Sequence, residues 1–374
     1  MKRELESIEI LGESDARVRT WGVLEAAFAE RQPVERPSRR LRIAIAVAVV
    51  AAAVAAVLSP PGQAVLDEIR EVVGVERAQP ALFSLPAQGR LLVASDAGVW
   101  VVQQDGSKRL LGPYREASWS PFGRFVVAAR ENELAALELD GDVRWTLSRP
   151  GVRFPRWAGT ETDTRIAYVD RAGLRVVAGD GTDDRLLAPA GDVLIAWRPG
   201  TPFVLGQLWA SELRQQNVNT TRVVARASAG AAFNQLHFSW SSDGRTALVV
   251  HPWELRLVDP ARDTIRRVSL RSADVRAAAF SPNGEHIAVL RERELVLVDT
   301  QKPRARQLRL FAGAGPLEGL AWSPDGDWLL VGWPTADQWV FVRADGKRIR
   351  AVSNVSEQLR SRSFPRIEGW CCAP

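Results

Sequence analysis

A five-residue segment that recurs along the chain constrains its fold more than any other feature. The sequence Trp-Ser-Pro-Asp-Gly stands at residues 322–326 between two apolar runs, and variants of it stand at 240–244, 280–284 and 119–123. Pro, Asp and Gly form tight turns, and Gly accepts the positive φ that many such turns need. Each copy therefore predicts a strand, a turn and a second strand. The same turn made several times predicts a repeat architecture.

The spacing of the aromatic residues gives the size of the repeat. Successive aromatic residues lie 38, 40, 43, 40 and 42 residues apart, and they are Trp119, Trp157, Trp197, Trp240, Phe280 and Trp322. A period near 40 with four short strands in each repeat is typical of the blades of a β-propeller. Asp-Gly pairs at 105–106, 140–141, 180–181 and 345–346 predict the hairpin turns before the fourth strands.

The two ends of the repeat region indicate how the ring closes. Residues 89–112 supply three strands but no clear inner strand, whereas residues 367–374 resemble the inner strand and turn at 317–324. We therefore expect the C-terminal strand to complete the first blade, which would leave no exposed sheet edge between the ends. The expected fold class is all-β, a seven-bladed β-propeller of four-stranded blades over residues 83–374.

The repeated turn resembles that of the TolB-type, WD-repeat-like propeller family, in which it joins the innermost strand of a blade to the next strand. The motif is strong at 322–326, 240–244 and 280–284 and degenerate at 157–160 and 197–200. The resemblance covers roughly residues 83–374 and implies the propeller fold. TolB itself is usually described with six blades, so the seven expected here are a departure. The role of TolB in envelope complexes does not carry over to this chain.

An apolar run near the N-terminus predicts a membrane anchor. Residues 43–58 contain no polar side chain, and with their flanks they approach the length of about 20 residues that spans a bilayer. Four arginines precede the run, so the positive-inside rule places residues 1–42 in the cytoplasm and the propeller outside the cell membrane. We expect a single-pass signal anchor at 43–61, followed by a juxtamembrane helix and linker at 62–82. A buried soluble helix and a cleaved signal peptide are the alternatives.

The cytoplasmic segment 1–42 contains a second amphipathic pattern. Residues 17–31 place Val18, Trp21, Leu24 and Phe28 on one face of a predicted helix. This face could bind a cytoplasmic protein or lie on the membrane, and a short helix without a specific partner is the alternative.

Charge and cysteine content exclude several classes of protein. The net charge of +5 comes from arginines without a dense basic stripe, so we expect no nucleic-acid partner. Cys371 and Cys372 are adjacent and cannot form a disulfide framework or a zinc site of the usual paired spacing. We expect them to be two small apolar residues of a terminal strand, with a vicinal disulfide as the alternative.

The sequence contains no pattern that would support catalysis. His237, His251 and His286 lack metal-ligand spacing, and there is no Gly-x-Ser-x-Gly elbow or glycine-rich phosphate loop. The aspartates at 180, 183 and 184 lack the length and the distal Glu of a helix–loop–helix calcium site. We therefore expect no catalytic residues, no metal and no cofactor.

The loops between second and third strands are the candidate binding surface. In these loops we single out Trp209, Trp253, Trp333, Arg130, Arg291 and Arg293. Trp and Arg are enriched among the residues that dominate interface energetics. The alternative is that each Trp covers the core of its own blade. We also expect residues 206–217 to be the longest loop insertion.

Three functions fit these observations. The first is a binding or scaffold module that presents the propeller to a protein or an envelope polymer. The alternative is a transmembrane sensor whose helix 17–31 holds a cytoplasmic partner, a layout that resembles membrane anti-sigma factors without the zinc-type His/Cys motif of many of them. The third is a propeller enzyme such as a lactonase or a lyase.

Overall fold

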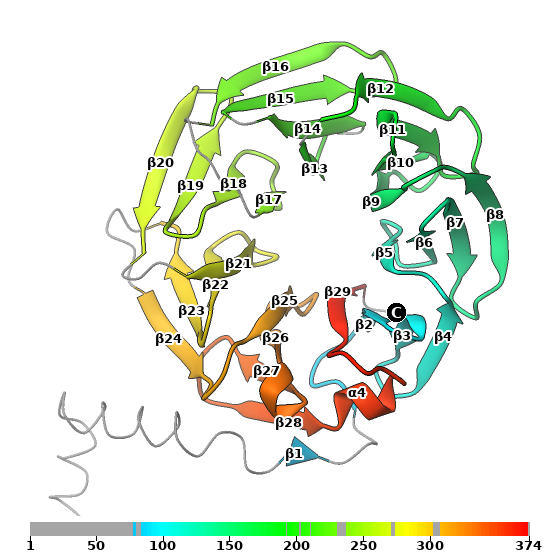
Figure 1. The fold of residues 1–374 in the computed structure, drawn as a ribbon. Helices are drawn as coiled ribbons and strands as arrows, with labels where there is room; N and C mark the ends of the chain where they lie inside the picture. Colours follow the sequence, from blue (N-terminus) through cyan, green and yellow to red (C-terminus); the bar gives the residue numbers. More distant parts are fainter. Residues whose placement is uncertain are drawn as a thin grey trace, which may run out of the picture. The chain divides into compact units, whose positions relative to one another are not determined.

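The repeat region forms a ring of β-sheets (Figure 1). The computed structural model describes residues 78–79 and 84–372, except 192, 202, 210, 230–236, 271–273 and 302–306. Within this part, the strands form seven sheets around a central axis, and each sheet contains four strands in antiparallel order. The predicted all-β, seven-bladed propeller of four-stranded blades is therefore confirmed.

The blades follow one another in chain order. Blade one contains β29 (Arg366–Cys371), β2 (Arg90–Ser95), β3 (Gly98–Val102) and β4 (Lys108–Gly112). Blade two contains β5 (Glu116–Trp119), β6 (Phe125–Arg130), β7 (Glu133–Glu138) and β8 (Val143–Ser148). Blade three contains β9 (Arg153–Gly159), β10 (Thr164–Val169), β11 (Gly173–Ala178) and β12 (Arg185–Pro189). Blade four contains β13 (Leu194–Trp197), β14 (Val204–Trp209), β15 (Glu212–Asn217) and β16 (Val223–Ser228).

The remaining blades include the only two helical turns found among the described residues. Blade five contains β17 (His237–Trp240), β18 (Ala247–Val250), β19 (Glu254–Asp259) and β20 (Thr264–Ser269). Blade six contains β21 (Val275–Phe280), β22 (His286–Arg291), β23 (Glu294–Asp299) and β24 (Gln307–Ala312). Blade seven contains β25 (Glu318–Trp322), β26 (Trp328–Trp333), β27 (Gln338–Arg343) and β28 (Ile349–Ser353). The 3₁₀ turn η1 (Pro334–Ala336) and the helix α4 (Val355–Gln358) flank β27 and β28.

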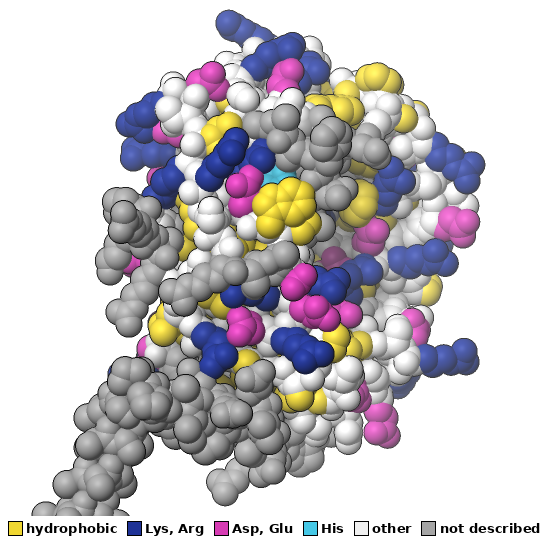
Figure 2. Space-filling view, turned by 60° about the vertical axis from the view of Figure 1, so that its left-hand side comes forward, with side chains coloured by type: hydrophobic (Ala, Val, Ile, Leu, Met, Phe, Trp, Pro, Cys, Tyr) yellow, Lys and Arg dark blue, Asp and Glu magenta, His cyan; other side chains and the backbone are white. Residues whose placement is uncertain are grey.

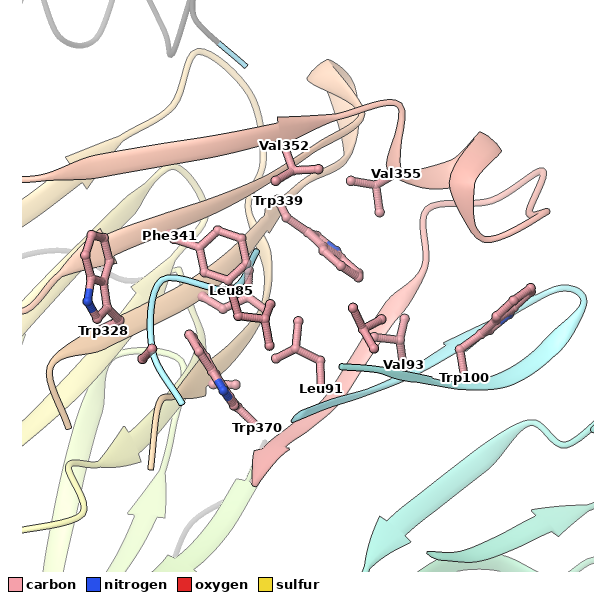
Figure 3. Close-up of a cluster of buried hydrophobic side chains, with 14 of the residues drawn as sticks. Leu85, Leu91, Val93, Trp100, Trp328, Trp339, Phe341, Val352, Val355 and Trp370 are labelled. Atoms are coloured by element: carbon pink, nitrogen blue, oxygen red, sulfur yellow. The ribbon is translucent and has the colours of Figure 1, made fainter. Parts of the chain in front are cut away.

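The C-terminal strand closes the ring as the sequence predicts. Strand β29 pairs antiparallel with β2, with Trp370 opposite Leu91. Both side chains belong to a buried cluster that also holds Trp339 and Phe341 of blade seven (Figure 3). The rings of Phe341 and Trp370 meet edge to face with centroids 5.6 Å apart. The first and last blades are therefore joined by pairing and by a shared core.

One short strand lies in a segment that we expected to be helix and linker. Strand β1 (Ala78–Gln79) runs parallel to β28 and adds a fifth strand to blade seven, with Ala78 opposite Ala351. These two residues are extended because they pair with β28. Two residues are too few to show the alternating pattern from which a strand is predicted.

The predicted N-terminal elements lie outside the described residues. These elements are the amphipathic helix 17–31, the anchor 43–61 and the juxtamembrane helix within 62–82, so they remain predictions. In the part of the chain that the structure describes, no helix has the length and apolarity needed to cross a membrane.

The recurring motif is a joint between neighbouring blades. The Ser323 hydroxyl, fully buried, accepts a hydrogen bond from the Trp328 amide at 2.9 Å and donates to Asp325 at 2.5 Å. Gly326 has φ +75°, which few other residues adopt without strain. The Trp322 indole donates to the Ala279 carbonyl of blade six at 3.2 Å. The Ser-Asp-Gly part thus closes the turn, while the Trp connects the blade to the one before it.

Two ends of the ring can be distinguished by their connections. We call turn face the end that carries the turns between first and second strands and between third and fourth strands. We call loop face the other end, which carries the loops between second and third strands and the connections from blade to blade. Because every blade has the same antiparallel order, this division holds around the whole ring.

The expected insertion at residues 206–217 is wrong. Residues 206–209 lie in β14 and 212–217 in β15, so a two-residue loop joins two regular strands. The longer spacing between Trp197 and Trp240 arises instead after β16, since eight residues separate Ser228 from His237. The sequence does not predict β15, because Leu213 is the one apolar residue in 212–217 and the buried Gln215 and Gln216 hide the strand pattern.

Candidate functional site

The structure divides the three candidate tryptophans by exposure. Trp253 is 48% exposed, whereas Trp333 is 6% exposed and meets the ring of Phe311 edge to face at 5.9 Å. Trp209 is half-buried and lies so close to Gly191 that a Cβ there would be 2.6 Å from its ring. Trp333 and Trp209 therefore cover the cores of blades seven and four, and Trp253 is the tryptophan that faces solvent.

Trp253 stands on a well-supported base on the loop face. Its ring stacks on that of His251 with centroids 6.2 Å apart. His251 is fully buried, and burial followed by the nearby charge of Arg256 lowers the pKa of its imidazole, which keeps the ring neutral. The Arg256 guanidinium pairs with Glu254 at 2.6 Å beneath the loop. An exposed aromatic side chain on a preorganised loop loses little conformational freedom when a partner covers it.

The three candidate arginines also separate. Arg291 is 7% exposed and bonds Glu294 at 3.2 Å and Gln307 at 2.7 Å, so its role is internal to blade six. Arg130 is exposed, pairs with Glu133 at 2.9 Å and lies over the ring of Tyr114. Arg293 is exposed in the same loop as Arg291.

Trp253 and Arg293 lie on neighbouring loops that share one support. The Val275 amide donates to the Pro252 carbonyl at 3.1 Å, and the Glu292 amide donates to the Asp274 carbonyl at 3.0 Å. The connection from blade five to blade six is therefore bonded to both loops. The structure brings these two candidates together, while Arg130 lies on blade two, away from them on the ring. We call the exposed part of residues 251–253 and 292–293 the loop-face patch.

The charged side chains on the outer surface do not gather into a patch on the side shown in Figure 2. On the side shown in Figure 2, basic side chains are spread over the surface and lie among acidic ones. Such mixing is usual for a solvated surface and differs from the continuous basic stripe of a nucleic-acid-binding face.

A group of charged residues on the innermost strands was not recognised in the sequence. Arg366 and Glu368 of β29 form an ion pair at 2.6 Å. Burial lowers the pKa of the Arg156 guanidinium of β9, an effect that the charges of Glu368 and Glu116 oppose. Burial raises the pKa of Glu368, an effect that the neighbouring arginines oppose. Desolvation by the surrounding protein, with the charge of Arg156, lowers the pKa of His237 to about 4, even though part of the His237 side chain is exposed.

This inner group draws its members from four blades. The residues are far apart in sequence and carry no shared motif, so only ring closure brings them near one another. Shifted pKa values occur at acid–base sites and also in structural ion-pair networks. Among the described residues, no three His, Cys, Asp or Glu side chains are placed to hold a metal ion.

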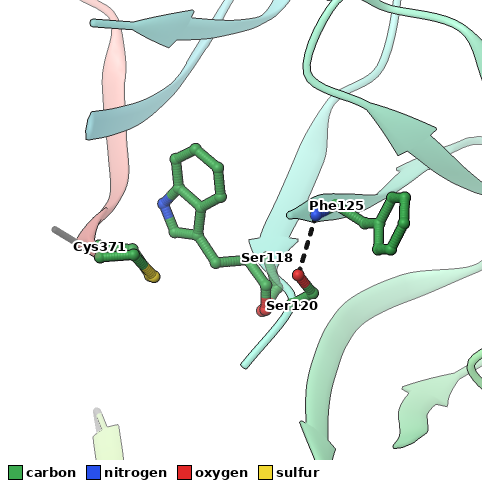
Figure 4. The surroundings of a disulfide bond; sticks show 6 residues. Ser118, Ser120, Phe125 and Cys371 are labelled. Atoms are coloured by element: carbon green, nitrogen blue, oxygen red, sulfur yellow. Dashed lines mark hydrogen bonds between the residues drawn. A yellow bond between two sulfur atoms is a disulfide. The ribbon is translucent and has the colours of Figure 1, made fainter. Parts of the chain in front are cut away.

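The two cysteines are joined in a vicinal disulfide, which corrects the expectation of two small apolar residues (Figure 4). Cys371 ends β29, and Cys372 follows it with φ +56°. The pair faces the turn after β5, where a Cβ on Gly123 would lie 2.7 Å from the Cys372 sulfur. Adjacency permits the bond, but the sequence could not show whether the pair is oxidised.

Comparisons with known proteins support the propeller fold and do not assign the chain to a family. No family model matches the chain, and no curated protein matches it. One similar solved structure is the mitotic checkpoint complex, with a TM-score of 0.54 and 15% identity over 72% of this chain and 90% of that one. Another is the Myceliophteria thermophila Cps50 (Swd1) β-propeller domain, with a TM-score of 0.51 and 10% identity over 64% and 86%.

A third similar structure comes from an enzyme. Kuenenia stuttgartiensis hydrazine synthase matches with a TM-score of 0.50 and 14% identity over 62% of this chain and 76% of that one. These structural matches support a WD40-like propeller fold for this chain, and at such low identities they show the fold alone. Membership of the TolB type is not established by them, and similar folds carry unrelated functions.

Proposed function

We propose that the protein is a membrane-anchored binding module whose propeller holds a partner protein outside the membrane through the loop-face patch. The observation that carries this proposal is Trp253, an exposed aromatic side chain stacked on a buried histidine. Exposed aromatic and arginine side chains on a rigid base are the usual anchors of protein interfaces. The propeller's likeness to a chain of the mitotic checkpoint complex, itself a protein assembly by name, is consistent with this role.

The proposal includes the anchor at 43–61 and the extracytoplasmic side for the propeller. Both rest on the apolar run and the arginines that precede it. The proposal does not include catalysis, because the inner charged group lacks a recognisable nucleophile or metal-binding set among the described residues.

Site-specific photocrosslinking in cells tests the proposed surface. A benzophenone amino acid at position 293 should give one adduct of defined mass, and the additional change Trp253→Ala should abolish it. Leu308 on β24 of the same blade is 45% exposed and provides a matched position away from the patch. The same adduct from position 308, or an adduct at 293 that survives Trp253→Ala, would contradict the proposal.

A further inference from the structure

A hollow lined by residues of two neighbouring blades lies on the turn face between blades two and three. This groove has a volume of about 770 Å³. Blade two contributes the turn 120–125 with Arg144 and Trp145, and blade three contributes residues 160–165 and the hairpin 178–183. The groove is thus at the opposite end of the ring from the loop-face patch, and it falls in the size range of ligand sites.

The groove occurs where the repeat departs from its pattern. In blades four, five and seven, the indole of the motif tryptophan donates a hydrogen bond to the preceding blade. Trp197, for example, donates to the Arg156 carbonyl at 2.8 Å. The Trp157 indole N–H finds no acceptor among the described residues, and its ring stacks instead on Phe125 with centroids 6.3 Å apart. The turn of blade two has Phe122, 47% exposed, where the motif has Asp. Trp157 therefore does not join the two blades in the usual way. Its ring and that of Phe125 line the bottom of the groove, and the ring of Phe122 lines its edge.

The two walls of the groove carry opposite charges. Arg124 and Arg144 lie on the wall from blade two. The wall from blade three carries four carboxylates, those of Glu161, Asp163, Asp180 and Asp183, against one base, Arg165. Asp163 pairs with Arg165, and Asp183 pairs with Arg185 behind the wall.

Two carboxylates on this wall remain available to a ligand. Glu161 is exposed and has no ion pair among those found in the described part of the chain. Asp180 accepts hydrogen bonds from the hydroxyl and amide of Thr182 at 2.7 and 3.0 Å, which lower its pKa and keep it ionised. These bonds also fix the direction of the Asp180 carboxylate without neutralising its charge.

A hydrogen bond and a close backbone approach connect the two blades at the base of the groove. The Trp145 indole donates to the Gly179 carbonyl at 2.9 Å and so ties blade two to blade three. Gly181 has φ +87°, and a Cβ there would lie 2.8 Å from the Trp145 ring. The hairpin therefore holds its carboxylates at a fixed place beside the aromatic residues.

Aromatic rings beside ionised carboxylates favour a cation. A guanidinium or ammonium group is attracted by an aromatic face and forms charge-assisted hydrogen bonds with carboxylates. The Arg144 guanidinium, which pairs with Glu138, lies 5.3 Å from the centroid of Phe125 and takes up that ring. The exposed ring of Phe122 is therefore the one open to a ligand. The net charge of the chain is +5, so a cationic ligand gains nothing from the protein as a whole and must be recognised locally.

We propose that this groove binds an extended basic segment of a partner protein, with an arginine or lysine side chain between the acidic wall and Phe122. The site is separate from the loop-face patch and would give the propeller two binding surfaces at its two ends.

Fluorescence anisotropy of the purified full chain tests this proposal. The probes are fluorescein-labelled (Ala-Arg)₄ and its acidic counterpart (Ala-Glu)₄ at low salt. The basic peptide should bind, and binding should weaken at high salt because exposed charges are screened. The double change Glu161→Gln and Asp180→Asn should raise the Kd about tenfold, which corresponds to about 1.4 kcal/mol.

Two further variants separate binding from folding. Phe122→Ala removes an exposed side chain, so it should leave the melting temperature unchanged and raise the Kd about three- to tenfold. Asp345→Asn changes the equivalent hairpin of blade seven and should leave the Kd unchanged. The proposal is overturned if the acidic peptide binds as tightly as the basic one, if the double variant binds like the unmodified chain, or if Asp345→Asn weakens binding equally.

Discussion

At the scale of single residues, position in the repeat does not determine the role of a side chain. Trp253 lies in the loop after β18 and Trp333 is the last residue of β26, so both stand where the second strand of a blade ends, yet one is exposed and the other is buried. The difference comes from the neighbouring blade, because Phe311 and Gly313 of blade six pack on Trp333. The sequence pattern identifies both as loop aromatics and cannot identify the neighbour that covers one of them.

This difference predicts two distinct effects of truncation. Trp333→Ala should lower the free energy of unfolding by about 3 kcal/mol or more, because it leaves a cavity in a packed core. Trp253→Ala should change it by less than about 1 kcal/mol, because the side chain is largely in water. Urea denaturation of the two variants measures both values, and equal losses would show that Trp253 is also a core residue.

His237 predicts a pH dependence of stability. The folded protein holds its pKa near 4, below the ordinary value of 6.5, so the unfolded chain binds more protons between these values. Stability due to His237 is therefore complete above about pH 6.5 and is lost as the pH falls towards 4. The change His237→Asn should flatten the plot of melting temperature against pH in this window. An unchanged slope would mean that His237 titrates normally.

At the scale of elements, the sequence predicted most of the structure. The four-strand blades, the turns and the closing role of β29 follow from residues that alternate or form turns locally, and each is confirmed. The sequence does not indicate strand β1, which depends on its pairing with β28, and it does not indicate the strands within 206–217, because buried glutamines hide the strand pattern. A strand with an apolar face can thus be predicted from its own residues. A strand that is extended only because it pairs with a neighbour cannot.

The closing strand gives a prediction about cooperativity. Removing residues 364–374 deletes β29, exposes the edge of β2 and takes Trp370 from the core shared by blades seven and one. The ring should then lose its cooperative unfolding transition, since its first blade has no inner strand. Circular dichroism during heating measures this, with Arg366→Ala as a control that keeps the strand. A truncated chain with an unchanged melting temperature would refute the closure as a source of stability.

At the scale of the whole molecule, the candidate binding surfaces show the limit of sequence-based prediction. The loop-face patch joins loops of two blades, and the groove joins turns of two others, so neither exists within one repeat. The sequence marks the place of the groove, because Phe122 and the degenerate turn after Trp157 depart from the motif on both of its walls. Which turns and loops face one another across two blades follows only from how neighbouring blades pack.

The predicted orientation of the molecule can be tested with its own cysteines. Cys371 and Cys372 are the two cysteines of the chain, and both belong to the propeller. If residues 43–61 anchor the chain with the propeller outside, a membrane-impermeant phosphine followed by an impermeant maleimide should label the protein on intact cells. The chain should also remain in the membrane fraction after an alkaline carbonate wash.

Controls make either outcome of this labelling informative. Lysed cells show whether the half-buried sulfurs react once reduced, and a Cys371→Ser, Cys372→Ser double variant shows that labelling is specific to this pair. Removing residues 43–61 should release the chain from the membrane, because no other run of the sequence was predicted to span it. Labelling that requires lysis would place the propeller in the cytoplasm, and the basic partner proposed for the groove would then have to be sought there.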